Sequence, residues 1–111
     1  MANNFKNQGY ALTTGGNVVY TAPSGDVLAT AIIHSMIISN IDGTNSADVS
    51  IKARSRAADA YFHVVKDVPV PAGSSLSIPK PVDLESGGDV HMTASANGDL
   101  EAVLSVLEIT V

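Results

Sequence analysis

The sequence predicts an all-β fold: an antiparallel β-sandwich of about eight strands, with jelly-roll or immunoglobulin-like Greek-key connections and no substantial helix. First, short apolar stretches recur about every 8 to 14 residues. Second, nine Gly and five Pro, with many Ser, Thr and Asn, supply turn residues between these stretches. Third, the one segment that could form a helical turn, residues 55–62, lacks the length and the capping residues of a stable helix.

Length and composition indicate one folded unit. A chain of 111 residues is close to the commonest domain size and buries roughly two thirds of its unfolded surface. Its 45% hydrophobic and 15% charged residues are typical of a globular protein rather than a disordered one. We expect a single sandwich domain over residues 10–111, preceded by a polar arm, residues 1–9, that is flexible or docks on a partner.

Turn chemistry orders the expected strands. Pro-Ser-Gly-Asp at 23–26, the loop 41–48 and Asn-Gly-Asp at 97–99 each carry the residues that tight turns require. Prolines at 69, 71, 79 and 81 cannot donate to a central ladder, so they restrict that region to sheet edges and crossings. The expected strands lie within residues 10–14, 18–22, 29–41, 49–55, 61–68, 68–81, 90–96 and 100–111.

Two of these strands alternate as half-buried strands do. In the first, Val49, Ile51 and Ala53 are expected to face the core, opposite Ser50, Lys52, Arg54 and Arg56. In the second, Val90, Met92, Ala94 and Ala96 are expected to face the core. Because the outer face of an antiparallel sandwich is normally polar, this pattern fits the predicted fold.

Two other strands are apolar on both faces. The long strand places Ile32, Met36 and Ile38 on one face and Ile33, Ile37 and Ile41 on the other. The last strand places Ala102, Leu104 and Val106 against Val103, Leu107, Ile109 and Val111. Either the chain's own arm or loops cover the second face, or another subunit does. A chain with room for one core favours another subunit.

Residue size suggests which face is the outer one. Ala31, Ile33, Ser35, Ile37 and Ser39 mix small and medium side chains, which would let another sheet approach closely. We therefore expect an oligomer or partner interface made of Ile33, Ser35, Ile37, Ser39, Val103, Leu107 and Ile109.

Charge and cysteine content limit the function. The net charge of −5 and the scattered basic residues argue against nucleic-acid binding, and the shared face of Lys52, Arg54 and Arg56 is interpreted as a solvated face. Without Cys there is no disulfide framework, thiolate zinc site or thiol nucleophile. The first residues lack a signal-peptide core, and no apolar run approaches the ~18 residues of a membrane span, so we expect no membrane partner.

The search for chemistry predicts no catalytic, cofactor or metal site, and hence no enzyme. His34, His63 and His91 lie on three different strands. The loop containing Asp42, Asn45 and Asp48 lacks the spacing of an EF-hand, and turn formation explains it. The Gly-rich residues 84–89 carry no Lys and begin no helix. The carboxylates flank turns, and none is marked as a catalytic pair: Asp83, Glu85, Asp89, Asp99 and Glu101.

Four stretches resemble a known protein group: IISNIDGTNSADVSIKA, VKDVPVPAGSSLSI, KPVDLESGGDV and TASANGDLEAVLSVLEI. The resemblance covers about residues 18–110, nearly the whole chain. Their shared elements are Ser39-Asn40 before an Asp-rich turn, the Val70 to Leu76 edge, the Leu84 to Asp89 turn and the closing Glu108-Ile109. The chain thereby resembles small virion structural proteins of tailed bacteriophages, including marine and cyanobacterial phages.

Similar domains occur as head decoration, or cement, proteins and as tail or neck components, and the size of this chain, a single bare sandwich, favours a decoration protein. Such proteins commonly assemble as homotrimers on the capsid surface, where they bridge subunits of the phage major capsid protein. We also expect synthesis in the host cytoplasm, and an N-terminal arm that orders on the capsid or on a neighbour through Phe5 and Tyr10 as apolar anchors. A tail, neck or connector component is the first alternative. A carbohydrate-binding module is the second, although such a module needs exposed aromatic rings and this chain has no Trp.

Overall fold

The computed structural model describes residues 2–24, 29–55 and 58–110. Parts of the expected turn at 23–26, together with Arg56 and Val111, lie outside the described residues. Within the described ranges no helix is long and apolar enough to cross a membrane. The strands in these ranges are β1 (Ala2–Ala11), β2 (Asn17–Thr21), β3 (Ala29–Asn40), β4 (Ala47–Ser55), β5 (Ala60–Val70), β6 (Ser75–Ile78), β7 (Val82–Glu85), β8 (Asp89–Ala94) and β9 (Leu100–Thr110).

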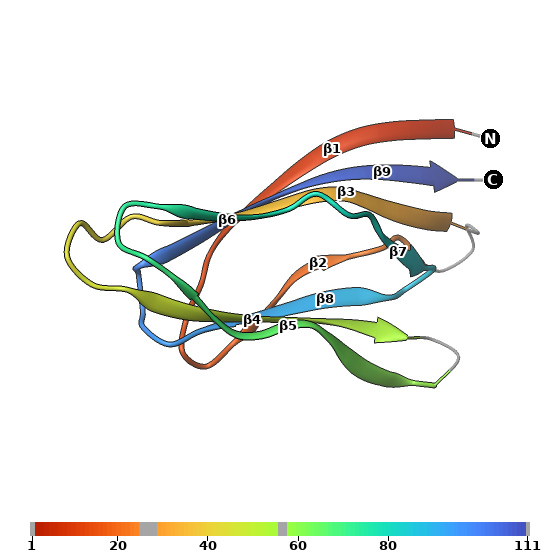
Figure 1. The fold of residues 1–111 in the computed structure, drawn as a ribbon. Coiled ribbons are helices and arrows are strands. Elements are labelled where there is room, and N and C mark those ends of the chain that lie inside the picture. Colours follow the sequence, from red (N-terminus) through yellow and green to blue (C-terminus); the bar gives the residue numbers. More distant parts are fainter. Residues whose placement is uncertain (1, 25–28, 56–57, 111) are drawn as a thin grey trace.

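The strands form two antiparallel sheets packed face to face (Figure 1). We call the sheet with the order β1, β9, β3 and then β6 sheet A; β7 pairs with β3 along the same side as β6. Sheet B has the order β2, β8, β4, β5. The chain crosses between the sheets repeatedly and returns β9 to lie between β1 and β3, which is a jelly-roll arrangement. This confirms the predicted all-β sandwich.

The core lies between the sheets and follows the alternation of the strands. Val49 and Ile51 of β4 and Val90 and Met92 of β8 are fully buried, as the sequence predicts. On sheet A the inward positions of β9 begin at Leu100 and recur at every second residue. Alternation therefore builds one apolar layer from both inner faces.

Strand β3 contains a β-bulge that reverses its two faces. Ile33 pairs with Val106 and Ser35 pairs with the next residue of β9, Ser105, so His34 is an extra residue in β3. Before the bulge Ala31 and Ile33 face the core, and after it the even-numbered residues do. The prediction that Ala31 and Ile33 lie on the outer face is wrong, because uninterrupted alternation does not hold across the extra residue.

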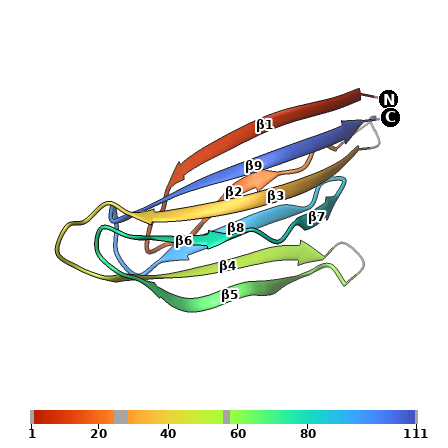
Figure 2. The ribbon, with the colours of Figure 1, turned by 45° about the horizontal axis from the view of Figure 1, so that its top comes forward.

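The expected N-terminal arm is a strand. Residues 2–11 pair continuously with β9, from Ala2 opposite Thr110 to Ala11 opposite Glu101 (Figure 2). The domain boundary predicted at residue 10 therefore falls near the end of β1. The sequence does not predict this strand, because β1 lies at the edge of the sheet. Main-chain hydrogen bonds hold it there, and its polar side chains remain exposed.

Prolines and a turn shape the remaining edges. Pro69 lies in β5 at the edge of sheet B, and Pro79 and Pro81 separate β6 from β7 at the edge of sheet A, as the sequence predicts. In the loop 41–46 the Asp42 carboxylate accepts hydrogen bonds from the Thr44 and Asn45 amides, which confirms the turn interpretation. The same hydrogen bonds lower the pKa of Asp42.

Candidate functional site: the two outer faces of the sandwich

The outer face of sheet A carries six apolar side chains from three adjacent strands. Residues directly opposite in an antiparallel pair point to the same side of the sheet, so the registers of β1, β9 and β3 place these side chains together. We call this surface the apolar face; it consists of Phe5, Ile32, Ile37, Val103, Leu107 and Ile109.

Five of the six residues of the apolar face form two cross-strand bands, and Ile109 lies beyond them, opposite Asn3 and Thr30. In one band Phe5 lies opposite Leu107, which lies opposite Ile32. In the other band Val103 lies opposite Ile37. The exposed fractions of Phe5, Ile37 and Val103 are 78%, 42% and 46%. Within the described residues these side chains therefore present apolar surface to solvent rather than to the core.

A polar row separates the two bands at the bulge. Asn7 lies opposite Ser105, and Ser105 lies opposite Ser35. The extra residue of the bulge, His34, is exposed, and its ring stacks on Phe5 at 6.0 Å between ring centres. The Phe5 ring thus reaches across β9 toward β3, and a partner on this face would meet apolar bands flanking a narrow polar row.

The structure places most of the predicted interface residues on this surface. Ile37 and Val103 are exposed, and Ser35, Ser39, Leu107 and Ile109 are partly exposed on the same side. Ile33 is in the core instead, and Ile32 takes the outer position that sequence reasoning missed. The signal for Ile32 was the presence of apolar residues on both faces of the strand, which a bulge also produces.

The two predicted anchors of the arm point to opposite sides of β1. Phe5 lies opposite Leu107 on the apolar face. Tyr10 lies opposite the buried Ala102 and packs against the core. Of the two aromatic residues, Phe5 alone is available to a partner at this surface.

The outer face of sheet B differs in chemistry. We call it the polar face; its polar side chains are Ser50, Lys52, Arg54, Tyr61, His63, Asp89 and His91, and Val18, opposite His91, is an exposed apolar side chain at its β2 edge. The Tyr61 hydroxyl donates a hydrogen bond to Asp89, and the Lys52 ammonium lies 5.1 Å from the centre of the Tyr61 ring. Arg54 pairs with Asp59, which lowers the pKa of that carboxyl group. Its charged groups therefore find partners within the chain.

A polar cluster around the buried Glu108 joins β1 to the rest of the sandwich. Glu108 of β9 accepts a hydrogen bond from the Tyr20 hydroxyl of β2, and its carboxylate lies 3.0 Å from the Lys6 ammonium of β1. Burial alone would raise the pKa of Glu108, but the hydroxyl and the ammonium together hold it below the usual value. Burial and the Glu108 charge raise the pKa of Tyr20. The cluster joins both sheets at the β1 margin.

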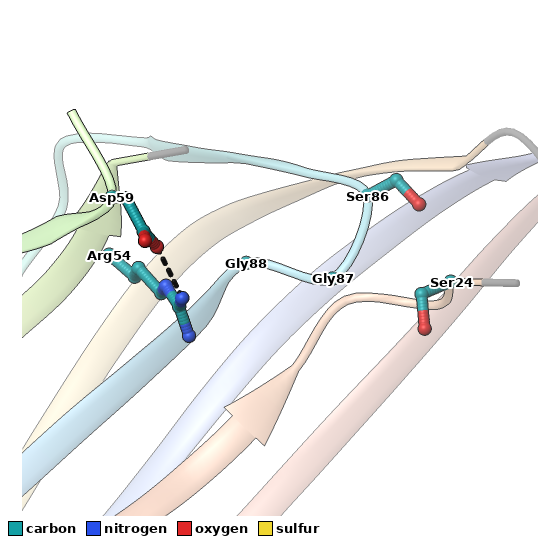
Figure 3. Close-up of a pocket in the computed structure, with 6 residues that line it drawn as sticks. All are labelled: Ser24, Arg54, Asp59, Ser86, Gly87 and Gly88. Carbon is teal, nitrogen blue, oxygen red and sulfur yellow. Dashed lines mark hydrogen bonds and ion pairs between the residues drawn. The ribbon is translucent and has the colours of Figure 1, made fainter. Parts of the chain in front are cut away.

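A shallow hollow lies at one end of the sandwich (Figure 3). Its described lining consists of Ser24, Arg54, Asp59, Ser86, Gly87 and Gly88. Its charged groups, Arg54 and Asp59, are paired with each other, and no histidine or second carboxylate of the described lining could act as a base toward the serines. The described part of this hollow does not support a catalytic site.

The three histidines do not converge. His34 lies on the outer side of sheet A, whereas His63 and His91 lie on the polar face, each opposite Lys52. Burial and the Lys52 charge lower the pKa of His91, against a smaller opposing effect of Asp89. Among the described residues no group of three metal-ligating side chains is close enough to hold an ion.

Sequence comparisons find no relative. No protein-family model matches the chain. No curated protein matches it either. The likeness to known proteins therefore rests on the fold.

Similar folds occur in virus particles and in a spore appendage. A chain of the infectious bursal disease virus particle matches with a TM-score of 0.59 and 6% identity over 98% of this chain, which spans only 31% of that chain's length. A chain from the capsid of the Helicobacter pylori bacteriophage KHP30 matches with a TM-score of 0.54 and 16% identity, covering 100% of this chain and 94% of that one. A subunit of the disulfide-linked pili on Bacillus endospores matches with a TM-score of 0.56 and 16% identity, covering 99% and 88%. At these identities the likeness shows a shared fold.

Proposed function

We propose that the chain is a virion structural protein, and more specifically a head decoration protein of a tailed bacteriophage that binds the outer capsid surface as an oligomer. The observation that carries the proposal is the apolar face. A chain of 111 residues leaves Phe5, Ile37 and Val103 exposed together on one sheet, whereas the outer face of the other sheet is mostly polar, with paired charges and with Val18 exposed at its β2 edge. Such an asymmetry is typical of a subunit that buries one face in an assembly.

The fold supports the same reading. A jelly roll that resembles chains of two virus particles over its whole length is a suitable unit for tiling a shell. In the proposed arrangement the apolar face meets sister subunits or the major capsid protein, and the polar face is exposed to solvent. Many copies, each making modest contacts, would together strengthen the contacts between capsid subunits.

A spore pilus is less well supported. The similar Bacillus subunit belongs to pili that are disulfide-linked, and this chain has no cysteine with which to form such a link. A tail, neck or connector position uses the same kind of domain, and the number of copies per particle distinguishes it from a decoration protein.

The copy number of this chain in purified virus particles tests the proposal. Quantitative mass spectrometry against the major capsid protein should give a ratio near one to one, which corresponds to hundreds of copies. Six to a few dozen copies would overturn the decoration role in favour of the neck or tail. Absence of the chain from the particle would overturn the virion role altogether.

A further inference from the structure

The edge strands of the described structure are not equally protected against pairing with another chain. β2 is short and its pairing with β8 is interrupted by a register shift, and β6 and β7 are short and separated by prolines. β5 carries Pro69, a left-handed Asp67 with φ of 50°, and register shifts against β4. Bulges, prolines and short lengths are the features by which proteins prevent edge-to-edge association.

β1 carries none of these features. Its ten residues pair with β9 without a register shift and contain no proline. Its single charged side chain, Lys6, turns toward Glu108 and is bound there. The free edge of β1 is therefore long and uninterrupted, and its one charged side chain, though 55% exposed, is held by Glu108.

The hydrogen-bond pattern between β1 and β9 identifies the main-chain groups that lie on the free edge of β1. The Leu12 amide donates to the Leu100 carbonyl in continuation of the register between β1 and β9. Because alternate residues of an antiparallel strand bond to the same neighbour, the even residues of β1 bond to β9. The odd residues direct their amide and carbonyl groups away from β9, to the free edge: Asn3, Phe5, Asn7, Gly9 and Ala11.

We infer that the free edge of β1 pairs antiparallel with β1 of a second copy, around a two-fold axis through Asn7. In this register Phe5 of one copy lies opposite Gly9 of the other, where a ring covers the space that a glycine leaves. The odd residues then exchange about ten main-chain hydrogen bonds. The neighbouring register, centred on Lys6, would place two ammonium groups directly opposite each other and is disfavoured.

The pairing joins two copies of sheet A into one continuous sheet. Since directly opposite residues share a side, the apolar faces of both copies lie on the same side of the joined sheet. The paired unit thus presents a doubled apolar face to whatever it binds. The inference rests on the edge of β1 and stands whether or not the protein belongs to a virion.

Proline at position 7 tests the pairing without disturbing the fold. The Asn7 amide faces the free edge, so the Asn7→Pro variant loses a hydrogen bond to the second copy but none to β9. Sedimentation equilibrium should give the unmodified chain a mass that is an even multiple of 11.4 kDa, and the Asn7→Pro variant half of that mass. The Asn7→Ala control keeps the amide and should keep the full mass, and circular dichroism should show the same strand content in all three proteins.

A cross-link tests the register. The chain has no cysteine, so one introduced thiol reports on a single position. Under oxidation Asn7→Cys should form a disulfide-linked dimer, because the two-fold axis places the thiols opposite each other. Asn3→Cys, on the same strand and the same side, lies opposite Ala11 and should not. A monomer or trimer whose mass Asn7→Pro leaves unchanged, equal cross-linking at both positions, or open-ended polymers in place of closed pairs would overturn the inference.

Discussion

The two outer faces of this sandwich are built from the same kind of alternating strand, yet their side chains have different contacts. On the polar face Tyr61 bonds to Asp89, Arg54 pairs with Asp59 and Lys52 lies over the Tyr61 ring. On the apolar face Phe5 and Val103 project from neighbouring strands, and the aromatic contact of Phe5 is with His34 of the same surface.

This difference shows which outer face needs no partner in the isolated chain. The polar face satisfies its charges locally, so water is a sufficient neighbour for it. The apolar face leaves apolar groups in water, and covering them is favourable at roughly 25 cal/mol for each Å² buried. The contrast is the basis for assigning the interface to sheet A, and the following variants test it from the largest expected effect to the smallest.

A charge in the middle of the apolar face should break the assembly. In the Ile37→Asp variant a carboxylate would be buried without a partner at the interface, which costs on the order of 3–5 kcal/mol and weakens association by more than about 100-fold. Sedimentation velocity over a dilution series measures the loss.

The matched control carries the same charge on the other sheet. His63 is exposed on the polar face, next to Lys52, so His63→Asp should leave association unchanged. An Ile37→Asp variant that assembles as well as the unmodified chain, or a His63→Asp variant that dissociates, would contradict the assignment of the faces.

Two isoleucines on β3 test the bulge. Ile33 is fully buried before it and Ile37 is 42% exposed after it, although both have odd numbers. Ile33→Ala should lower the free energy of unfolding by about 2–4 kcal/mol, and Ile37→Ala of the monomer by less than about 1 kcal/mol. Urea denaturation of both variants measures the difference, and equal losses would mean that the strand has no such reversal.

The cluster that fixes β1 beside the apolar face predicts a pH dependence. The folded pKa of Glu108 lies below its usual 4.5, so its stabilising effect is present above that pH and is lost as the pH falls through the lowered pKa. Glu108→Gln should cost on the order of 1–3 kcal/mol at neutral pH and should reduce the acid sensitivity of unfolding below about pH 4.5.

The matched carboxylate for this prediction lies at the other sheet. Asp59 also has a lowered pKa, through Arg54, but the pair is exposed to solvent. Asp59→Asn should therefore change the unfolding midpoint far less than Glu108→Gln in the same acid titration. An equal effect of both variants would show that burial at the β1 margin is not what gives Glu108 its importance.

Much of the fold could be predicted from the sequence because turns and alternation are local signals. Prolines at 69, 79 and 81 marked the edges, and the alternation of β4 and β8 identified their inner faces. The apolar residues on both sides of β9 correctly indicated one inner and one outer set, because β9 runs without a bulge.

The rest depended on pairing partners that a single sequence does not name. A strand with a bulge at His34 and a regular strand that is apolar on both faces give the same sequence pattern. Only the register against β9 distinguishes the two structures. The strand β1 escaped prediction because Asn, Lys and Gln mask an extended segment held by main-chain hydrogen bonds. The cluster of Lys6, Tyr20 and Glu108 likewise joins residues far apart in the sequence.

The most direct test of the central claim compares solvent access to the two faces before and after assembly. Single thiols introduced as Val103→Cys on the apolar face and His63→Cys on the polar face can be labelled in the isolated chain and in assembled particles. Assembly should slow labelling at position 103 by at least about tenfold and leave position 63 unchanged. Equal labelling of position 103 in both states, or protection of position 63 instead, would contradict the claim that sheet A carries the interface.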